Sequence, residues 1–346
     1  MPFSAQELES ISNGVLDFHQ KGDAAAQSVQ DKPLLSMLYA NKKNFAAGKE
    51  FITGNVKGDY TTTGTGFTHN DTVGYNNPSN LKRYQYAWKE RHYGIEVTGT
   101  ELKKAGITVT DGVNLEGTTR HTGSEVAVIT DLLVDKLDDM EEGCSRDMNN
   151  MLWGDGTADS EDIPGIMSVI RDDPAPGVAE TVGGLSSATT WWRNRASLGI
   201  ATNAATQPIL TKLQTEWRQL RRFGGKPDHI FAGSDLLSAL EAELRANGSY
   251  TDTGWVKGGR LDGAMAELGF KGVAIQYDPT LDDLGRSKFC YVIDSRRIRL
   301  RPMEGEDMKF HSPDRPHNQY VYYKAKTFTG GLECSQRNCH GVYSIA

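Results

Sequence analysis

Apolar residues recur at steps of three and four along one long stretch of the chain. They are Val126, Ile129, Leu133, Leu137, Met140, Cys144, Met148 and Met151. This spacing places them on one face of a helix, and Thr122 and Glu125 stand just before it at the spacing of a capping box. We therefore predict one helix over 125–153. A coiled coil is the alternative, but the interior Gly143 and the scarcity of basic partners favour a helix packed on a sheet.

Upstream of this helix the pattern changes to the two-residue alternation of a strand. A first phase consists of Tyr84, Tyr86 and Trp88, and a second consists of Tyr93, Ile95 and Val97. A bulge near Glu90–His92 accounts for the slip between them. Because the preceding segment 51–74 is rich in Gly and Thr, we predict a long two-stranded extended loop over 49–97.

The aromatic residues of the first phase, Tyr84, Tyr86 and Trp88, need a surface to cover them. An isolated two-stranded ribbon is only marginally stable in water, so we predict that a neighbouring subunit contacts these three side chains. The alternative is that the two strands belong to a larger sheet within the same chain.

The remaining segments predict an α+β fold with a mixed α/β core. Residues 1–48 resemble an arm of short helices with little core, one near Leu8–Phe18 and one that begins at Pro33. After 161, amphipathic helices over 206–223 and around 236–244 alternate with short apolar runs. These runs are His229–Ala232, Val273–Tyr277 and Phe289–Ile293, and strands that alternate with helices are typical of a mixed core.

Composition and charge narrow the class of protein. The net charge of -7 disfavours a protein whose main task is to bind nucleic acid, since that needs a concentrated basic face. Arg218, Arg221 and Arg222 cluster at the end of one predicted helix, where they complement the helix dipole; weak contact with DNA or with a neighbour is the alternative. We expect no membrane span and no signal peptide, and hence a cytosolic protein.

The sequence offers no strong catalytic or cofactor motif. Gly64-Thr-Gly66 lacks the rest of a dinucleotide fingerprint, and Gly224-Gly225-Lys226 is followed by Pro227 where a phosphate loop needs Ser or Thr. We therefore predict no catalytic residue and no cofactor. Zinc ligands are conceivable at Cys334, Cys339 and His340, joined by His317, but their spacing favours ordinary buried thiols, and we predict no metal.

The order of these elements resembles the major capsid proteins of tailed bacteriophages, which share the HK97-type fold. The resemblance rests on the extended loop from Phe51 to Val97, the helix 125–153, Trp153-Gly-Asp-Gly-Thr157, Ile163-Pro-Gly-Ile166 and Trp191-Trp-Arg-Asn194. It implies an N-terminal arm (1–48), an extended loop (49–97), a peripheral domain (98–160 and 295–346) with its spine helix at 125–153, and an axial domain (161–294).

The resemblance also implies function and partners. Such a chain self-assembles into hexamers and pentamers that close an icosahedral shell around the double-stranded DNA of the phage, in the cytoplasm of the host. Portal, scaffolding and decoration proteins are the expected partners. Some members crosslink a loop lysine. Lys57 and Lys82 qualify by location alone, and no motif fixes an acceptor or a catalytic acid, so we make no prediction of a crosslink. An encapsulin-like compartment and a mixed α/β enzyme are the alternatives.

Overall fold

The computed structural model describes residues 3–4, 31–58, 60, 62–77, 80–104, 109–110, 123–175, 181–203, 205–246, 269–311 and 321–346. The chain forms two compact units: residues 1–30, 90–148 and 305–329 make up the first, and residues 31–89, 149–304 and 330–346 the second. The helix predicted near Leu8–Phe18 lies outside the described residues.

The first unit combines a long helix with small sheets. The elements that lie wholly or mostly in it are β1 (Phe3–Ser4), β4 (Lys89–Thr98), α3 (Gly99–Lys104), β5 (Val109–Thr110), α4 (Gly123–Trp153), β14 (Lys309–His311) and β15 (Val321–Cys334). Strand β15 pairs with β4 and, in antiparallel fashion, with β14, while β1 and β5 form a short parallel pair. Of the helices that the structure describes, none combines the length and apolar character that a bilayer crossing requires.

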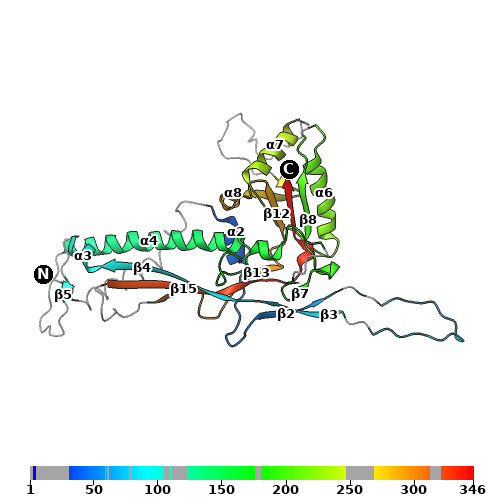
Figure 1. Ribbon diagram of the computed structural model, residues 1–346, viewed down its shortest axis with the longest axis horizontal. Helices are drawn as coiled ribbons and strands as arrows, with labels where there is room; N and C mark the ends of the chain where they lie inside the picture. The colour runs from blue at the N-terminus through cyan, green and yellow to red at the C-terminus, as the bar shows by residue number, and fades with distance from the viewer. Residues whose placement is uncertain are drawn as a thin grey trace. The chain divides into compact units, whose positions relative to one another are not determined.

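The helix predicted over 125–153 is confirmed as α4 (Figure 1). Within the first unit, the described part of its predicted apolar stripe is buried, namely Leu137, Met140, Cys144 and Met148. Polar contacts then fix the rotation of the helix: the carboxylate of Asp147 accepts hydrogen bonds from Arg91 at 2.8 Å and from the Tyr93 hydroxyl at 2.9 Å. Since both partners belong to β4, this carboxylate ties the helix to its sheet.

The second unit is built around a six-stranded sheet in the order β10-β11-β9-β12-β16-β8. These strands are β8 (Arg195–Ile200), β9 (His229–Ala232), β10 (Gly269–Phe270), β11 (Val273–Tyr277), β12 (Phe289–Ile293) and β16 (Gly341–Ile345). The limits of β9, β11 and β12 are those predicted from the sequence. Short apolar runs of this kind mark strands that are buried on both faces.

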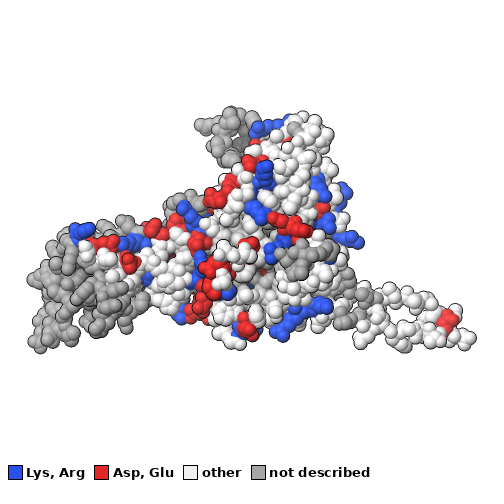
Figure 2. All heavy atoms as spheres, in the orientation of Figure 1, with Lys and Arg blue, Asp and Glu red and all other residues white. Residues whose placement is uncertain are grey.

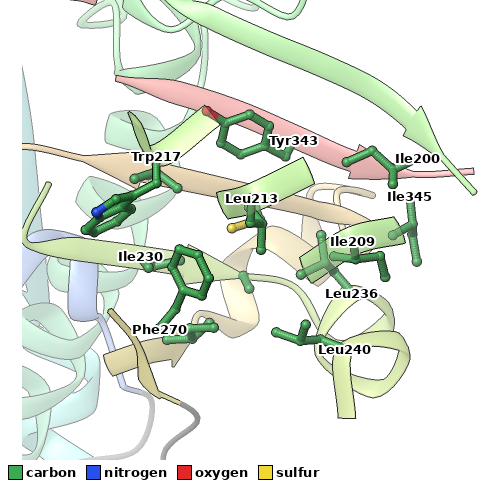
Figure 3. Close-up of a cluster of buried hydrophobic side chains, with 14 of the residues drawn as sticks. Ile200, Ile209, Leu213, Trp217, Ile230, Leu236, Leu240, Phe270, Tyr343 and Ile345 are labelled. Carbon is green, nitrogen blue, oxygen red and sulfur yellow. The ribbon is translucent and has the colours of Figure 1, made fainter. Parts of the chain in front are cut away.

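Two amphipathic helices, α6 (Pro208–Arg221) and α7 (Ser234–Ala246), build the core on one face of this sheet. Figure 3 shows apolar side chains of α6 and α7 converging on those of the strands. Trp217 of α6 meets Phe270 edge-on with ring centroids 5.5 Å apart. Burying one such apolar side chain contributes about 1.5–3 kcal/mol, so this cluster is a main source of stability for the sheet.

The opposite face of the sheet holds a buried polar junction. Asp278 caps α8 (Pro279–Asp283) by accepting from the backbone N–H of Thr280 at 3.0 Å, and it also accepts from the Trp153 indole at 2.8 Å. Asn149 donates to the Thr280 hydroxyl at 2.7 Å and accepts from the backbone N–H of Leu35 at 3.2 Å. Burial raises the pKa of Asp278. These contacts fix α8, the end of α4 and the start of α2 (Pro33–Ala40) to one another.

The helix predicted from Pro33 is confirmed as α2, and it packs within the second unit. Leu34, Met37 and Leu38 are buried, and Phe45, just beyond the helix, bridges to Met303 next to β13 (Ile298–Pro302). This part of the predicted arm is therefore buried against residues of its own chain.

The C-terminal segment differs from the expectation for 295–346. Strand β16 lies inside the six-stranded sheet, between β12 and β8, and residues 330–346 belong to the second unit. The bulge predicted near Glu90–His92 is also wrong, because the chain instead breaks at Ala87–Trp88 between β3 (Leu81–Tyr86) and β4. Strand β4 then leaves the ribbon and pairs with β15.

Candidate assembly interface

The extended loop is the most exposed described part of the chain. Strands β2 (Ile52–Lys57) and β3 pair antiparallel, with Ile52 opposite Tyr86 and Lys57 opposite Leu81. The chain continues beyond them as a long open loop (Figure 1). We call its described residues 60–77 the loop tip. A loop that leaves its own body in this way buries little surface within its own chain.

The loop tip presents aromatic side chains to solvent. Tyr60 is 80% exposed, Phe67 61% and Tyr75 98%. Exposed aromatic side chains of this kind are typical anchors of protein interfaces, since they bury a large area for little loss of side-chain entropy. The sequence from Gly58 to Asn80 contains no Lys or Arg and two Asp residues, so the loop is slightly acidic.

A local turn shapes the loop tip. The carboxylate of Asp71 accepts hydrogen bonds from both the backbone N–H and the hydroxyl of Thr68, each at 2.8 Å. The backbone N–H of Asp71 in turn donates to the Thr68 carbonyl at 2.9 Å. The two bonds from Thr68 lower the pKa of Asp71. The loop therefore carries a structured turn between Phe67 and Val73 rather than an unconstrained chain.

The base of the loop is anchored in the second unit by two tyrosines. Tyr84 stacks on Trp192 with ring centroids 6.2 Å apart, and its hydroxyl donates to the carboxylate of Glu333, which also binds Arg301. The hydroxyl of Tyr86 donates to the carbonyl of Cys334 at 3.2 Å. Burial, and secondly the neighbouring Glu333, raise the pKa of Tyr84. The anchor is therefore a neutral phenol held by the carboxylate of a partly buried ion pair.

A short hairpin clamps the anchored strand from its other side. It consists of β6 (Thr181–Val182) and β7 (Leu185–Ser186). The carbonyl of Gly183 in its turn accepts from the backbone N–H of Gln85 at 2.9 Å. Gly183 has a φ of +59°, and a Cβ there would lie 2.7 Å from the Tyr86 ring. Only glycine fits this position, because it lies in the left-handed region and in contact with the ring.

The structure places the predicted contact residues differently from the expectation. Tyr84 and Tyr86 are buried in their own chain, so the reason for expecting a neighbouring subunit against them does not apply. The expected alternative, a larger sheet within the same chain, does not hold for these strands either, because β2 and β3 form a sheet of two strands. Both tyrosines are covered instead by residues outside that sheet. Trp88 is half-buried and donates from its indole to the Lys49 carbonyl at 2.9 Å. A contact between Trp88 and another subunit stays a prediction.

Sequence reasoning missed the partners of this anchor. Glu333 lies 249 positions from Tyr84 in the sequence, and Arg301, Trp192 and Gly183 are also far from it along the chain. No local signal marks them, since a glycine turn and a mid-strand Glu are common. The exposed aromatic side chains of the loop tip were missed as well, because an isolated Tyr or Phe in a Gly- and Thr-rich segment has no periodicity.

The other predicted positions lie apart from the loop anchor. Arg218, Arg221 and Arg222 are all exposed at the C-terminal end of α6, as their sequence position indicates. Lys57 and Lys82 are exposed on the two strands at the base of the loop.

The cysteine and histidine cluster has the geometry of a packed interior. Cys334, Cys339 and His340 are fully buried, and the Cys339 sulfur lies 3.5 Å from His340 Nε2. His340 Nδ1 accepts from the backbone N–H of Asp294 at 3.2 Å, which leaves the proton of the neutral ring on Nε2. That nitrogen is therefore no base for the thiol, whose own hydrogen bond goes to the Gln336 carbonyl at 3.0 Å.

Electrostatics agree with this reading of the cluster. Burial lowers the pKa of His340 to about 3 and raises the pKa of Cys334 to about 12. A buried neutral imidazole and buried protonated thiols are typical of a structural core. Among the described residues, no group of three or more His, Cys, Asp or Glu side chains is arranged to hold a metal ion; His317 lies outside them.

Comparison with known proteins gives structural matches only. No protein-family model matches the sequence, and no curated protein does so either. Among solved structures, this fold is similar to that of a chain in the capsid asymmetric unit of cyanophage A-1(L). The match has a TM-score of 0.64 and 15% identity, and it covers 92% of this chain and 94% of that one.

Two further structures have the same fold. A chain from the capsid of Myoviridae phage XM1 matches with a TM-score of 0.51 and 11% identity, over 92% of this chain and 94% of that one. A chain from the capsid of a native GTA particle matches with a TM-score of 0.54 and 9% identity, over 92% of each chain. The predicted α+β fold is confirmed, and it is the fold of chains from phage capsids.

Proposed function

We propose that this chain is a major capsid protein that assembles into hexamers and pentamers and closes an icosahedral shell around double-stranded phage DNA. The observation that carries the proposal is the fold that this chain shares with a capsid chain over nearly the whole length of both chains. A fold alone does not define a function, and the extended loop adds an independent argument from this chain's own residues.

The exposed aromatic side chains of the loop tip support the same function. Phe67 and Tyr75 are largely exposed to solvent, and a monomer gains nothing from exposing such rings. A neighbouring subunit that covers the loop would bury these rings and lock the two subunits together. The subunit would then act by geometry, with many modest contacts that combine into one stable shell.

The proposal includes the wider assembly. Portal, scaffolding and decoration proteins would be partners of the shell, assembly would take place in the cytoplasm of a bacterial host, and packaged DNA would be contacted without sequence preference. The negative net charge supports only weak contact with DNA, since strong phosphate binding needs a basic face.

Negative-stain electron microscopy combined with light scattering tests the proposal. The full chain is expressed alone and together with the genes next to its own. Closed shells, or rings of six and five subunits, are the expected result. A monomer or a small dimer under all of these conditions would contradict the proposal. Purified shells that contain protein cargo and no DNA would instead identify a compartment shell.

A further inference from the structure

The two faces of the six-stranded sheet are covered by different elements. Side chains alternate along each strand, so Ile230 and Val292 point into the core under α6 and α7, whereas Phe231 and Tyr291 point the other way. There Trp153 packs against both rings, at centroid distances of 5.8 and 5.1 Å. Surface charges borne on α6 and on the segment after Trp153 therefore lie on opposite sides of the sheet.

A basic patch lies on the α6 side. Arg218, Arg221 and Arg222 are exposed at the end of the helix, and Phe223 beside them is 56% exposed. In the described part of the chain, none of the three guanidinium groups forms an ion pair; Arg222 lies over the Phe223 ring at 5.3 Å. Figure 2 shows Lys and Arg gathered along the side on which α6 lies. We call these four residues the basic patch.

An acidic segment lies on the other side. It carries Asp155, Asp159, Glu161 and Asp162, directly after the end of α4. The guanidinium of Arg286 packs over the Phe289 ring at 4.3 Å and forms a salt bridge with Asp172. The negative charges of Asp172 and Asp155 both act to raise the pKa of Arg286. Because Phe289 is two residues before Tyr291, this places the segment on the Tyr291 face. Within it, Glu161 forms a salt bridge with Lys89 at 3.5 Å.

Both surfaces lie at the same end of the sheet. An open groove of about 690 Å³ runs along the edge strand β8, and its lining includes Arg222 and Phe223 as well as Asp172 and Asp173. The basic patch and the segment that continues the acidic one therefore border the same groove. A second copy placed face to back would bring unlike charges together without a shift along the strands.

From this arrangement we infer that the basic patch of one copy binds the acidic segment, residues 155–162, of the next copy in a ring. The inference rests on the proposed function, since a ring of identical subunits needs two different, complementary surfaces on each copy. One chain cannot join its own two surfaces across the sheet. Phosphate groups of DNA would fit the basic patch but would leave the acidic segment without a role.

Paired charge reversals test this contact. The first variant combines Arg218→Glu with Arg221→Glu, and the second combines Asp159→Lys with Glu161→Lys. Each has two surfaces of like charge, so at low salt the fraction of chain in rings should fall about tenfold or more. A control variant, Arg245→Glu with Lys271→Glu, reverses two exposed cations elsewhere in the same unit and should assemble normally.

Mixing the two variants gives the sharpest readout. In an equimolar mixture each surface of one variant complements a surface of the other, so rings should reappear, with the two variants in alternation. Alternation permits six subunits and forbids five. Electron microscopy should therefore show rings of six without rings of five, whereas the wild type forms both. Rings in neither variant nor in the mixture, while the control assembles, would overturn the inference.

Two further measurements keep the outcomes distinct. Melting temperatures near that of the wild type show that the reversed variants fold. The milder pair Arg218→Gln and Arg221→Gln should lose part of the assembly, and added salt should weaken wild-type rings as the screening length falls from about 10 Å at 0.1 M to about 3 Å at 1 M. A wild type that never assembles refutes the proposed function. Reversed variants that assemble like the wild type, even if they lose retention of a DNA duplex, refute only the inference.

Discussion

The base and the tip of the extended loop carry the same kind of side chain in opposite surroundings. At the base, Tyr84 and Tyr86 are buried against Trp192, Glu333 and the Gly183 turn; at the tip, Tyr60 and Tyr75 project into solvent. The difference lies in what the rest of the chain places beside each ring. The base tyrosines stabilise the folded subunit, and the tip aromatics contribute only once a second molecule covers them.

The largest expected effect is at the base. Tyr84→Ala removes a buried ring and leaves the Glu333 and Arg301 pair with one partner fewer, so it should lower the free energy of unfolding by about 3–4 kcal/mol. Urea unfolding followed by tryptophan fluorescence measures this, because Trp192 stacks on the ring. A loss below about 1 kcal/mol would show that the ring is not buried in solution.

Acid should have the next largest effect on stability, through His340. The folded pKa of His340 is depressed to about 3, against about 6.5 in the unfolded chain. The unfolded state therefore binds the proton first, and stability, fully present above pH 6.5, falls as the pH drops toward 3. The loss at pH 5 should be about 2 kcal/mol.

His340→Asn isolates this effect. The Asn carbonyl oxygen can accept the hydrogen bond that the Asp294 N–H now gives to Nδ1, and Asn does not titrate. Stability of the variant should be nearly flat between pH 6.5 and 5 in urea titrations. An unchanged slope would assign the acid sensitivity to other groups.

A smaller effect is expected at the clamp. Gly183→Ala places a methyl group against the Tyr86 ring at a backbone φ of +59°, and should reduce stability by about 1–2 kcal/mol. Gly199→Ala is a matched control, since Gly199 also has a positive φ but open space around its Cβ. Thermal unfolding of the pair separates backbone strain from the clash: equal losses would mean that the clamp does not hold the ring.

The smallest effect on stability belongs to the loop tip. Tyr75→Ala removes a side chain that is 98% exposed, so the free energy of unfolding should change by less than about 0.5 kcal/mol. The same variant should form fewer shells, seen as a smaller fast-sedimenting fraction. A stability loss comparable to that of Tyr84→Ala would abolish the distinction between base and tip.

Local patterns predicted the elements of this chain better than their partners. The limits of β9, β11 and β12 follow from short apolar runs, and α4 follows from its capping box and its repeated spacing. Tyr84 shows the limit of such reasoning. Its alternation correctly indicated a strand, but the residues that cover it are distant in sequence, and only the tertiary fold brings them near.

The same limit applies to the basic patch and the acidic segment. The three arginines of α6 were identified from their clustering alone, whereas the acidic segment that complements them was not, because its carboxylates look like an ordinary polar turn after a helix. Their relation depends on which face of the sheet each one occupies. That information resides in the pairing of β12 with β9 and β16, which no local pattern specifies.

The position of β16 has a consequence for the timing of folding. Residues 341–345 lie between β12 and β8, and among the described strands β8 pairs with β16 alone. Strand β8, made far earlier on the ribosome, therefore waits for these residues to be synthesised. Pairings between residues so distant in sequence form slowly. Until then the subunit lacks a complete six-stranded sheet, and the contacts that depend on it are withheld.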